Sequence, residues 1–149
     1  MVDCRTGRRM KIKKIHSQAK TPTRGSYDSA GHDLYSVQHA IIPPHRSAKL
    51  GTGLCMEMEK GTVGLIWERS KLASKFGLQV MGGVVDCDYR GEVMISLYNN
   101  SDTPYEVKVG DRMAQIIFQQ YIDYDFEDVE QLNDTPRGTN GINSTENRL

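Results

Sequence analysis

Residues 83–92 read GVVDCDYRGE and combine small, β-branched, acidic and aromatic residues within a short span. The valines favour a strand, whereas the acidic residues and Gly91 favour a turn. We therefore interpret the stretch as one arm of a hairpin, the turn and the start of the next strand. Asp86 and Tyr89 would then stand beside a small slot lined by backbone. Such a slot suits a flat polar ligand with a water molecule activated next to it.

The strands expected around this stretch are short and numerous. Alternating or β-branched runs, separated by turn-forming residues, predict strands at residues 11–15, 34–37, 40–42, 50–58, 62–67, 78–85, 92–98, 105–109 and 113–122. Residues 70–76 favour a helix, with Ser70 as its N-cap and Gly77 just after its end. The pattern predicts an all-β fold, a distorted jelly-roll barrel or sandwich with one short α-helix. Trp67, at a strand end, is expected in the core.

The length and composition of the chain suit a single globular domain. Of 149 residues, 38% are hydrophobic and 26% are charged, and lysine plus arginine balances aspartate plus glutamate at 19 each. A chain of this length can bury a core. A net charge of zero gives no overall attraction to nucleic acid or to an anionic membrane. We expect neither as a partner, so any phosphate group must be bound by locally placed arginines and amides.

The cysteines indicate the compartment. The chain has an odd number of cysteines, Cys4, Cys55 and Cys87, and their spacing is not that of a zinc site. We therefore expect free thiols in a reducing compartment, with Cys55 and Cys87 as small buried residues. The sequence shows no signal peptide, and no apolar run approaches the ~18 residues needed to cross a bilayer. These features predict a soluble, intracellular protein, cytoplasmic or nuclear.

The two ends of the chain differ in composition from the middle. Residues 1–10 are basic and lack an apolar period, so we expect a flexible N-terminal arm. Residues 11–124 carry the expected strands and form the β domain. Residues 125–149 begin as an acidic linker and continue into a polar C-terminal arm, which composition alone would describe as a disordered tail.

Several polar clusters offer the chemistry that hydrolysis of a nucleoside triphosphate needs. Charge builds on phosphate oxygens, so such a site uses arginines, hydroxyls, amides and usually Mg²⁺, with a carboxylate that orients and deprotonates a water. Arg69 and Ser70 stand at the expected helix start, where unpaired amides also point outward. Gln115 and Arg137 supply a further amide and a further guanidinium.

Five clusters, in order along the chain, resemble the five motifs of the trimeric dUTP diphosphatases (dUTPases). They are AGHDLYS at residues 30–36, ERSKLA at 68–73, GVVDCDYRGEV at 83–93, GDRMAQIIF at 110–118 and RGTNGINST at 137–145. Their order and spacing match those of the family. The resemblance implies a jelly-roll homotrimer with three active sites between subunits. In it, the C-terminal arm of one subunit closes as a lid over a site built by the others.

The resemblance also implies a reaction, the hydrolysis of dUTP to dUMP and pyrophosphate with Mg²⁺, which limits dUTP and supplies dUMP for dTMP synthesis. Asp86 matches the acid that activates the attacking water, and Tyr89 matches the ring that packs on the deoxyribose. The backbone around Gly83 and Val85 matches the hairpin that receives uracil. Asp33 matches the acid that holds waters on the magnesium, so no direct protein ligand to the metal is expected.

The other substrate contacts implied by the resemblance lie in the second, fourth and fifth motifs. They are Arg69, Ser70, Gln115, Arg137, Ile142 and Ser144. Lys71 is a further candidate that could either add charge near phosphate or point to solvent. The second motif departs from the family's usual Pro-Arg-Ser-Gly or Pro-Arg-Ser-Ser, because Glu68 and Lys71 flank Arg69-Ser70. The fifth motif has Ile142 and Asn143 where the family usually has an aromatic residue and glycine. Isoleucine can cover a base but cannot stack on it.

Two other functions fit parts of this pattern. A non-catalytic dUTPase-like protein-interaction module would be expected to have lost the acid or the lid arginine, whereas Asp86 and Arg137 are both present. A dCTP deaminase on a related scaffold needs a glutamate that activates water against cytosine, and no glutamate stands at a motif position that fits. Both stand as alternatives to a dUTP diphosphatase.

Overall fold

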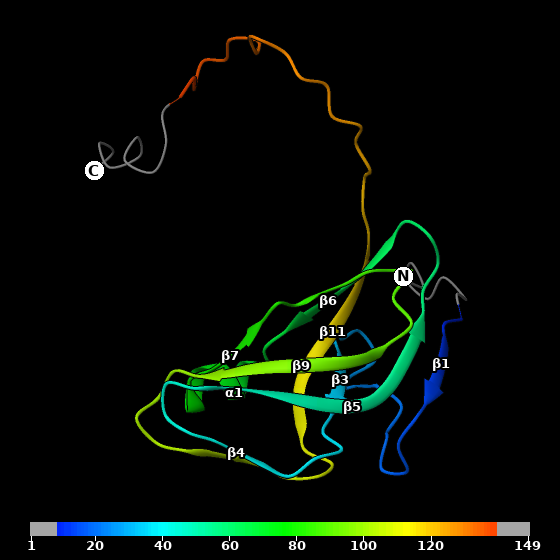
Figure 1. Cartoon of the computed structure of the whole chain (residues 1–149), viewed down its shortest axis with the longest axis vertical. Helices are drawn as coiled ribbons and strands as arrows, with labels where there is room; N and C mark the ends of the chain where they lie inside the picture. The colour runs from blue at the N-terminus through cyan, green and yellow to red at the C-terminus, as the bar shows by residue number, and fades with distance from the viewer. Residues whose placement is uncertain (1–8, 140–149) are drawn as a thin grey trace.

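The computed structural model describes residues 9–139, and its regular secondary structure is antiparallel β-sheet apart from one short helix (Figure 1). Its elements are β1 (Lys11–Lys14), β2 (Thr23–Arg24), β3 (His32–Tyr35), β4 (Ala40–Ile42), β5 (Ser47–Glu57), β6 (Thr62–Trp67), α1 (Ser70–Phe76), β7 (Leu78–Met81), β8 (Val84–Val85), β9 (Glu92–Asn99), β10 (Tyr105–Val107) and β11 (Arg112–Gln120). A four-stranded sheet has the order β1-β5-β9-β7, a five-stranded sheet has the order β2-β3-β11-β6-β8, and β10 pairs with β4. The predicted all-β class with one short helix is confirmed.

The core lies between the sheets and follows the alternation of their strands. In β9, Val93, Ile95 and Leu97 face inward and alternate with more exposed neighbours. From the other sheet, Leu34 of β3 and Ile116 of β11 are also fully buried. Burial of each such side chain stabilises the fold by about 2 kcal/mol. The pairing of β11 with both β3 and β6 therefore rests on a well-packed inner face.

The sequence prediction was wrong about residues 78–85, which form two strands rather than one. β7 pairs with β9 in the four-stranded sheet, whereas β8 pairs with β6 in the five-stranded sheet. The chain changes sheet at Gly82, whose φ of 64° suits glycine. At Gly83 a side chain would collide with the carbonyl oxygen of Ile66. β8 pairs with β6, and β9 pairs with β5 and β7, so β8 and β9 are not the two arms of a hairpin. The sequence could not show this, because the alternation of residues in a strand does not reveal a change of sheet.

Three smaller expectations also need correction. The N-cap of α1 is Arg69 and not Ser70, and no side chain caps the helix. Trp67 is 52% exposed instead of buried, since Ile66 beside it in the strand faces the core. Cys55 and Cys87 are only half-buried, and neither is in a disulfide.

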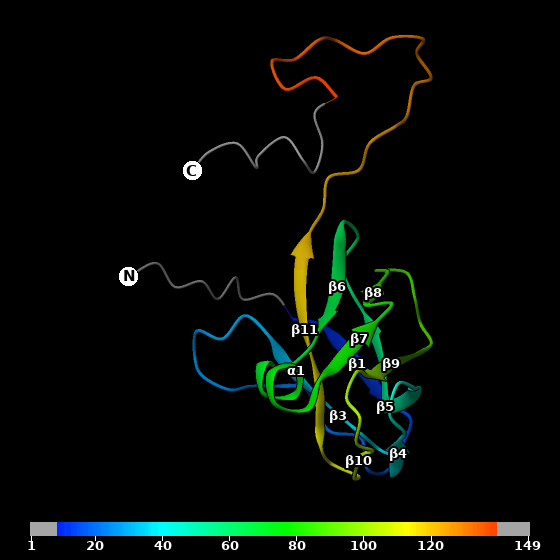
Figure 2. The same ribbon diagram turned by 90° about the vertical axis from the view of Figure 1, so that its left-hand side faces the viewer.

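The last part of the described chain leaves the body of the molecule. β11 ends at Gln120, and the described residues that follow carry no helix or strand and are exposed up to residue 139. Figure 2 shows this segment as an irregular coil that runs away from the sheets and then bends back. It includes exposed Tyr124 and Phe126. Within residues 9–139, no helix is long and apolar enough to cross a membrane.

Candidate functional site

A buried carboxylate lies at the centre of a polar cluster on the five-stranded sheet. The side chain of Asp33 is only 11% exposed. Its Oδ1 accepts a hydrogen bond from Nε of Arg69 at 2.8 Å, and its Oδ2 accepts one from Nη1 of Arg112 at 3.2 Å. Each oxygen of the carboxylate thus holds one guanidinium. The two arginines are kept close together although their charges repel, because Asp33 lies between them.

Strand pairing explains why these residues meet. Asp33 is opposite Gln115, and Tyr35 is opposite Arg112, in the antiparallel pair of β3 and β11. Arg112 and Gln115 are three residues apart, so in a regular strand they would face opposite sides of the sheet. The pairing shifts between Arg112 and Ala114, as it does at a β-bulge. This irregularity lets both side chains contribute to the same region.

Gln115 joins the cluster to the segment before α1. Its Nε2 donates a hydrogen bond to the main-chain carbonyl of Glu68 at 2.8 Å. Its Oε1 occupies the space that a side chain at position 31 would need, so Gly31 leaves room for this amide. The carboxamide of Gln115 is therefore fixed in place, beside the residue that precedes Arg69. Three of the five sequence motifs meet here.

Ser70 and Lys71 form the exposed start of α1 next to this cluster. The carbonyl of Arg69 accepts the N–H of Leu72 at 2.8 Å and that of Ala73 at 3.0 Å. With the Arg69 side chain turned to Asp33, the first N–H groups of the helix have no side-chain cap among the described residues. Hydroxyl, ammonium and guanidinium groups are thus available at one place, an arrangement that favours phosphate oxygens.

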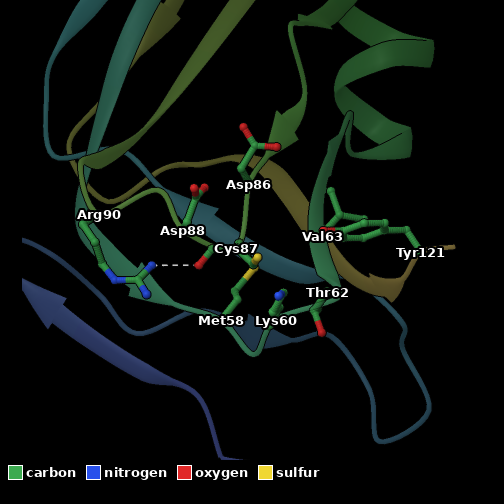
Figure 3. Close-up of a pocket in the computed structure, with 9 residues that line it drawn as sticks. All are labelled: Met58, Lys60, Thr62, Val63, Asp86, Cys87, Asp88, Arg90 and Tyr121. Atoms are coloured by element: carbon green, nitrogen blue, oxygen red, sulfur yellow. Dashed lines mark hydrogen bonds between the residues drawn. The ribbon is translucent and has the colours of Figure 1, made fainter. Parts of the chain in front are cut away.

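Asp86 lies in a different part of the molecule, just after β8. It is exposed and lines an open pocket of about 850 Å³ together with Lys60, Thr62 and Tyr121. Figure 3 shows its carboxylate pointing away from Lys60 and Thr62. Among residues 9–139, no hydrogen bond or ion pair reaches this carboxylate. The oxygens of this carboxylate are therefore open to solvent.

The loop after Asp86 holds Tyr89 in a defined place. The Tyr89 N–H donates to the carbonyl of Asp86 at 3.2 Å, and its hydroxyl donates to the carbonyl of Glu92 at 3.2 Å. Its ring lies against Gly91, where any side chain would collide with it. The ring is nevertheless 47% exposed, so Tyr89 is not a core residue. It presents a flat apolar surface near Asp86.

The fold does not bring Asp86 and Arg69 together within one chain. Val85 pairs with Gly64, and Asp86 follows beside Val63, near the beginning of β6. β6 ends at Trp67, just before Arg69. The four residue-to-residue steps from Val63 to Trp67 span about 13 Å along a strand. The residues predicted for catalysis and for phosphate binding therefore lie towards opposite ends of β6.

The lid residues are only partly described. Arg137 is exposed and lies in a turn in which the N–H of Gly138 donates to the carbonyl of Thr135 at 3.0 Å. Ile142 and Ser144, the other predicted contacts of the fifth motif, lie outside the described residues.

Two side chains near the candidate site have shifted pKa values. The charge of the neighbouring Cys87, followed by burial and Asp123, raises the pKa of Tyr121 above its ordinary value. Burial, followed by the charge of Arg24, lowers the pKa of His32. Within residues 9–139, no group of three or more His, Cys, Asp and Glu side chains could hold a metal ion directly.

Arg112 is the member of the cluster that the sequence reasoning missed. It stands in the fourth motif, GDRMAQIIF, next to the turn at Gly110. The signal that could have found it is an arginine three residues before Gln115 in the same strand. Only the bulge makes that spacing meaningful.

Comparison with known proteins identifies relatives over nearly the whole chain. The family model described as dUTPase matches residues 17–146. A deoxyuridine 5'-triphosphate nucleotidohydrolase of Paramecium bursaria Chlorella virus 1 is 42% identical over 134 residues, which cover 90% of this chain and 95% of the viral protein. The protein of the same name from Arabidopsis thaliana is 43% identical over 135 residues, which cover 91% and 81% of the two chains.

Solved structures also match. The dUTPase of Staphylococcus bacteriophage 80alpha with dUPNHPP has a TM-score of 0.86 at 23% identity, covering 92% of this chain and 98% of that one. A mutant dUTPase from phage phi11 of S. aureus, described with a structural Mg(II) ion, has a TM-score of 0.79 at 22% identity, covering 85% and 100%. These matches confirm the predicted jelly-roll fold.

Proposed function

The chain belongs to the dUTPase family, and from this premise we propose that it is a dUTP diphosphatase that hydrolyses dUTP to dUMP and pyrophosphate. The observation that carries the proposal is the cluster around Asp33, where residues of three motifs meet as a site for phosphate oxygens. The reaction would limit dUTP and supply dUMP for dTMP synthesis.

We assign the role of general base to Asp86. Its carboxylate takes a proton from a water whose oxygen bonds to the α-phosphorus, while the bond from that phosphorus to the bridging oxygen breaks and pyrophosphate leaves. Arg69, Ser70, Lys71 and Gln115 bind and orient the triphosphate. The exposure of Asp86, without a described partner, supports this role, because its oxygens are open to a water molecule.

Tyr89 and the backbone around Gly83 account for the choice of nucleoside. A ring held against Gly91 can pack on deoxyribose and leave no room for a 2′-hydroxyl. Backbone groups near Gly83 and Val85 would pair with the edge of uracil. Cytosine presents an acceptor where uracil has N3–H, so a backbone carbonyl would face it unpaired. A 5-methyl group, as in thymine, would be excluded by contact with the walls of the slot.

Magnesium fits the cluster as an ion that the protein holds through water. A carboxylate has about four lone-pair positions, and the arginines use two of those on Asp33. Asp33 can therefore also accept hydrogen bonds from magnesium-bound waters, while the phosphates supply the direct ligands. When bound, Mg²⁺ would neutralise charge on the phosphate oxygens during the reaction.

We also propose a homotrimer whose active sites lie between subunits. The separation of Asp86 from Arg69 along β6 supports this assembly, because a second subunit would have to supply what one chain leaves apart. Arg137, Ile142 and Ser144 of the C-terminal arm would then close over the triphosphate and base. In this division, residues 11–124 form the domain, residues 1–10 an N-terminal arm and residues 125–149 the linker and lid.

An intracellular location, cytoplasmic or nuclear, completes the proposal. The two described cysteines, Cys55 and Cys87, are not in a disulfide. This supports a reducing compartment.

The proposal is tested by measuring pyrophosphate release from dUTP, dCTP, dTTP and UTP with Mg²⁺. We expect release from dUTP to exceed that from each of the others by at least about 100-fold, because a backbone group left unpaired or a steric clash penalises them. Comparable rates for all four nucleotides would contradict it. Ammonia release from dCTP would favour the deaminase, and no turnover of any nucleotide would favour the interaction module.

A further inference from the structure

Glu68 makes a contact that a proline at its position could not make. Its Oε1 accepts a hydrogen bond from the backbone N–H of Val80 at 2.8 Å. Glu68 directly precedes Arg69, and its main-chain carbonyl accepts the Nε2 of Gln115 at 2.8 Å. One residue therefore binds to β7 through its side chain and to β11 through its backbone.

The two contacts join the two sheets. β7 is one of the two edge strands of the four-stranded sheet, and β11 lies inside the five-stranded sheet. N–H groups on the free side of an edge strand have no neighbouring strand to pair with. Glu68 supplies a charged acceptor to one of them, which makes a stronger bond than a neutral acceptor would. The segment between β6 and α1 is thereby attached to both sheets through Glu68.

This fixed segment carries the groups assigned to phosphate. Arg69 is the next residue in the chain, and its side chain is held by Asp33. Gln115 is held by the Glu68 carbonyl. If the Glu68 side chain lost its hydrogen bond to the N–H of Val80, the backbone at Arg69 would become more mobile. The Glu68 carbonyl that accepts the Gln115 amide would become more mobile as well. An arginine in a mobile segment binds phosphate less tightly, since it must be ordered on binding.

We propose that Glu68 is a positioning residue for the polyphosphate of the substrate, acting through its bond to the Val80 N–H. The side-chain bond replaces the restriction that proline gives this position in the usual second motif of the family. Glu68 does not touch the phosphates, since its carboxylate is directed to β7. This inference rests on the proposed function, because it assigns the ligand as a nucleoside triphosphate.

The test compares binding of two ligands by titration calorimetry. A dUTP analogue with an imido bridge between the α- and β-phosphates reports the whole triphosphate, and dUMP reports the base, the sugar and one phosphate. In Glu68→Ala we expect the Kd of the analogue to rise about tenfold and that of dUMP to stay within about twofold. Glu68→Gln keeps an acceptor oxygen, so its Kd for the analogue should stay within about threefold of the unsubstituted protein.

Glu57→Ala serves as the matched control, because it removes an exposed glutamate whose partner is Lys11 of β1. It should leave both Kd values unchanged. If Glu68→Ala does not fold, Glu68→Met keeps the length of the side chain without the acceptor and carries the same expectation. Unchanged binding of the analogue, equal weakening of both ligands, or a glutamine variant as weak as the alanine variant would overturn the assignment.

Binding of the analogue by the unsubstituted protein distinguishes failure of the positioning role from failure of the proposed function. If it binds the analogue and the Glu68 variants bind equally well, the positioning role fails while the proposed function stands. If the unsubstituted protein does not bind the analogue at all, the proposed function fails, and the positioning role fails with it.

Discussion

The Asp33 cluster and the Asp86 loop carry the groups assigned to the reaction. Within one chain, the carboxylate of Asp33 has hydrogen-bond partners, whereas that of Asp86 has none among the described residues. Asp33 is buried and holds Arg69 and Arg112 with both of its oxygens. Asp86 is exposed, and Figure 3 shows it directed away from Lys60 and Thr62 of its own pocket. The cluster proposed to bind phosphate is therefore held together within one chain, whereas the carboxylate proposed as the base has no hydrogen-bond partner among the described residues.

This difference indicates which part of the chemistry depends on assembly. Groups that are already in place lose little freedom when the substrate binds. If Asp86 is the base, as proposed, it would contribute only when another chain, or the C-terminal arm, brings the substrate to it. We expect changes at Asp86 and in the arm to affect turnover, and changes at Asp33 to affect stability and affinity.

The largest effect is expected from Asp86→Asn. Asparagine has nearly the same shape but cannot take a proton, so kcat should fall by about 10²- to 10⁴-fold. The Kd of a non-hydrolysable dUTP analogue should change little. Because Asp86 is exposed, the free energy of unfolding should stay within about 0.5 kcal/mol of the original. Pyrophosphate release and urea denaturation measure the two quantities, and unchanged turnover would remove Asp86 from its role.

The next effect is expected from removing residues 135–149. Loss of the arm should lower kcat/KM for dUTP by about 100-fold, because the substrate is no longer closed in and oriented. The described part of the removed segment, residues 135–139, is exposed and contributes nothing to the core. The circular dichroism spectrum and the mass of the assembly in solution should therefore stay the same. Full activity of the shortened chain would show that the arm is not a lid.

A smaller effect is expected from Asp33→Ala. The substitution leaves two guanidinium groups without their acceptor, which should lower the free energy of unfolding by about 1–3 kcal/mol. The loss is limited because Arg112 is half-exposed and can turn to water. Asp102→Ala is the control, since that carboxylate is almost fully exposed and pairs with His45. There we expect less than about 1 kcal/mol. Equal losses in the two variants would mean that the Asp33 cluster is not preorganised by burial.

The smallest effect concerns His32, which precedes Asp33 in β3. Burial, and then Arg24, lower its pKa below 6.5, so the unfolded chain binds this proton more readily than the folded one. The contribution of neutral His32 to stability is therefore fully present above about pH 6.5, and it is lost as the pH falls from there through the folded pKa. Between about pH 7 and about pH 5, the Tm of the His32→Gln variant should therefore fall less than the Tm of the unsubstituted protein. His39→Gln is the control, and an identical loss in the original and both variants would contradict the prediction.

Much of the local structure could be predicted from the sequence. β4, β6 and α1 have the predicted bounds, because β-branched runs and a glycine after a short helical stretch are strong local signals. The structure also brings together Asp33, Arg69 and Gln115, which the sequence singled out, and adds Arg112, which it did not. The error at Trp67 had a local cause, since its side of β6 follows directly from alternation with Ile66.

What the sequence by itself determined was the class of fold, most strand positions and the chemical groups available for the reaction. The tertiary structure alone decided the change of sheet at Gly82, the irregular pairing that places Arg112 beside Asp33, and the bond from Glu68 to the edge of β7. It also decided that Asp86 and Arg69 lie towards opposite ends of β6. The physical reason is that alternation records only which side of a strand is buried. Pairing partners and register are set by contacts between residues far apart in the chain.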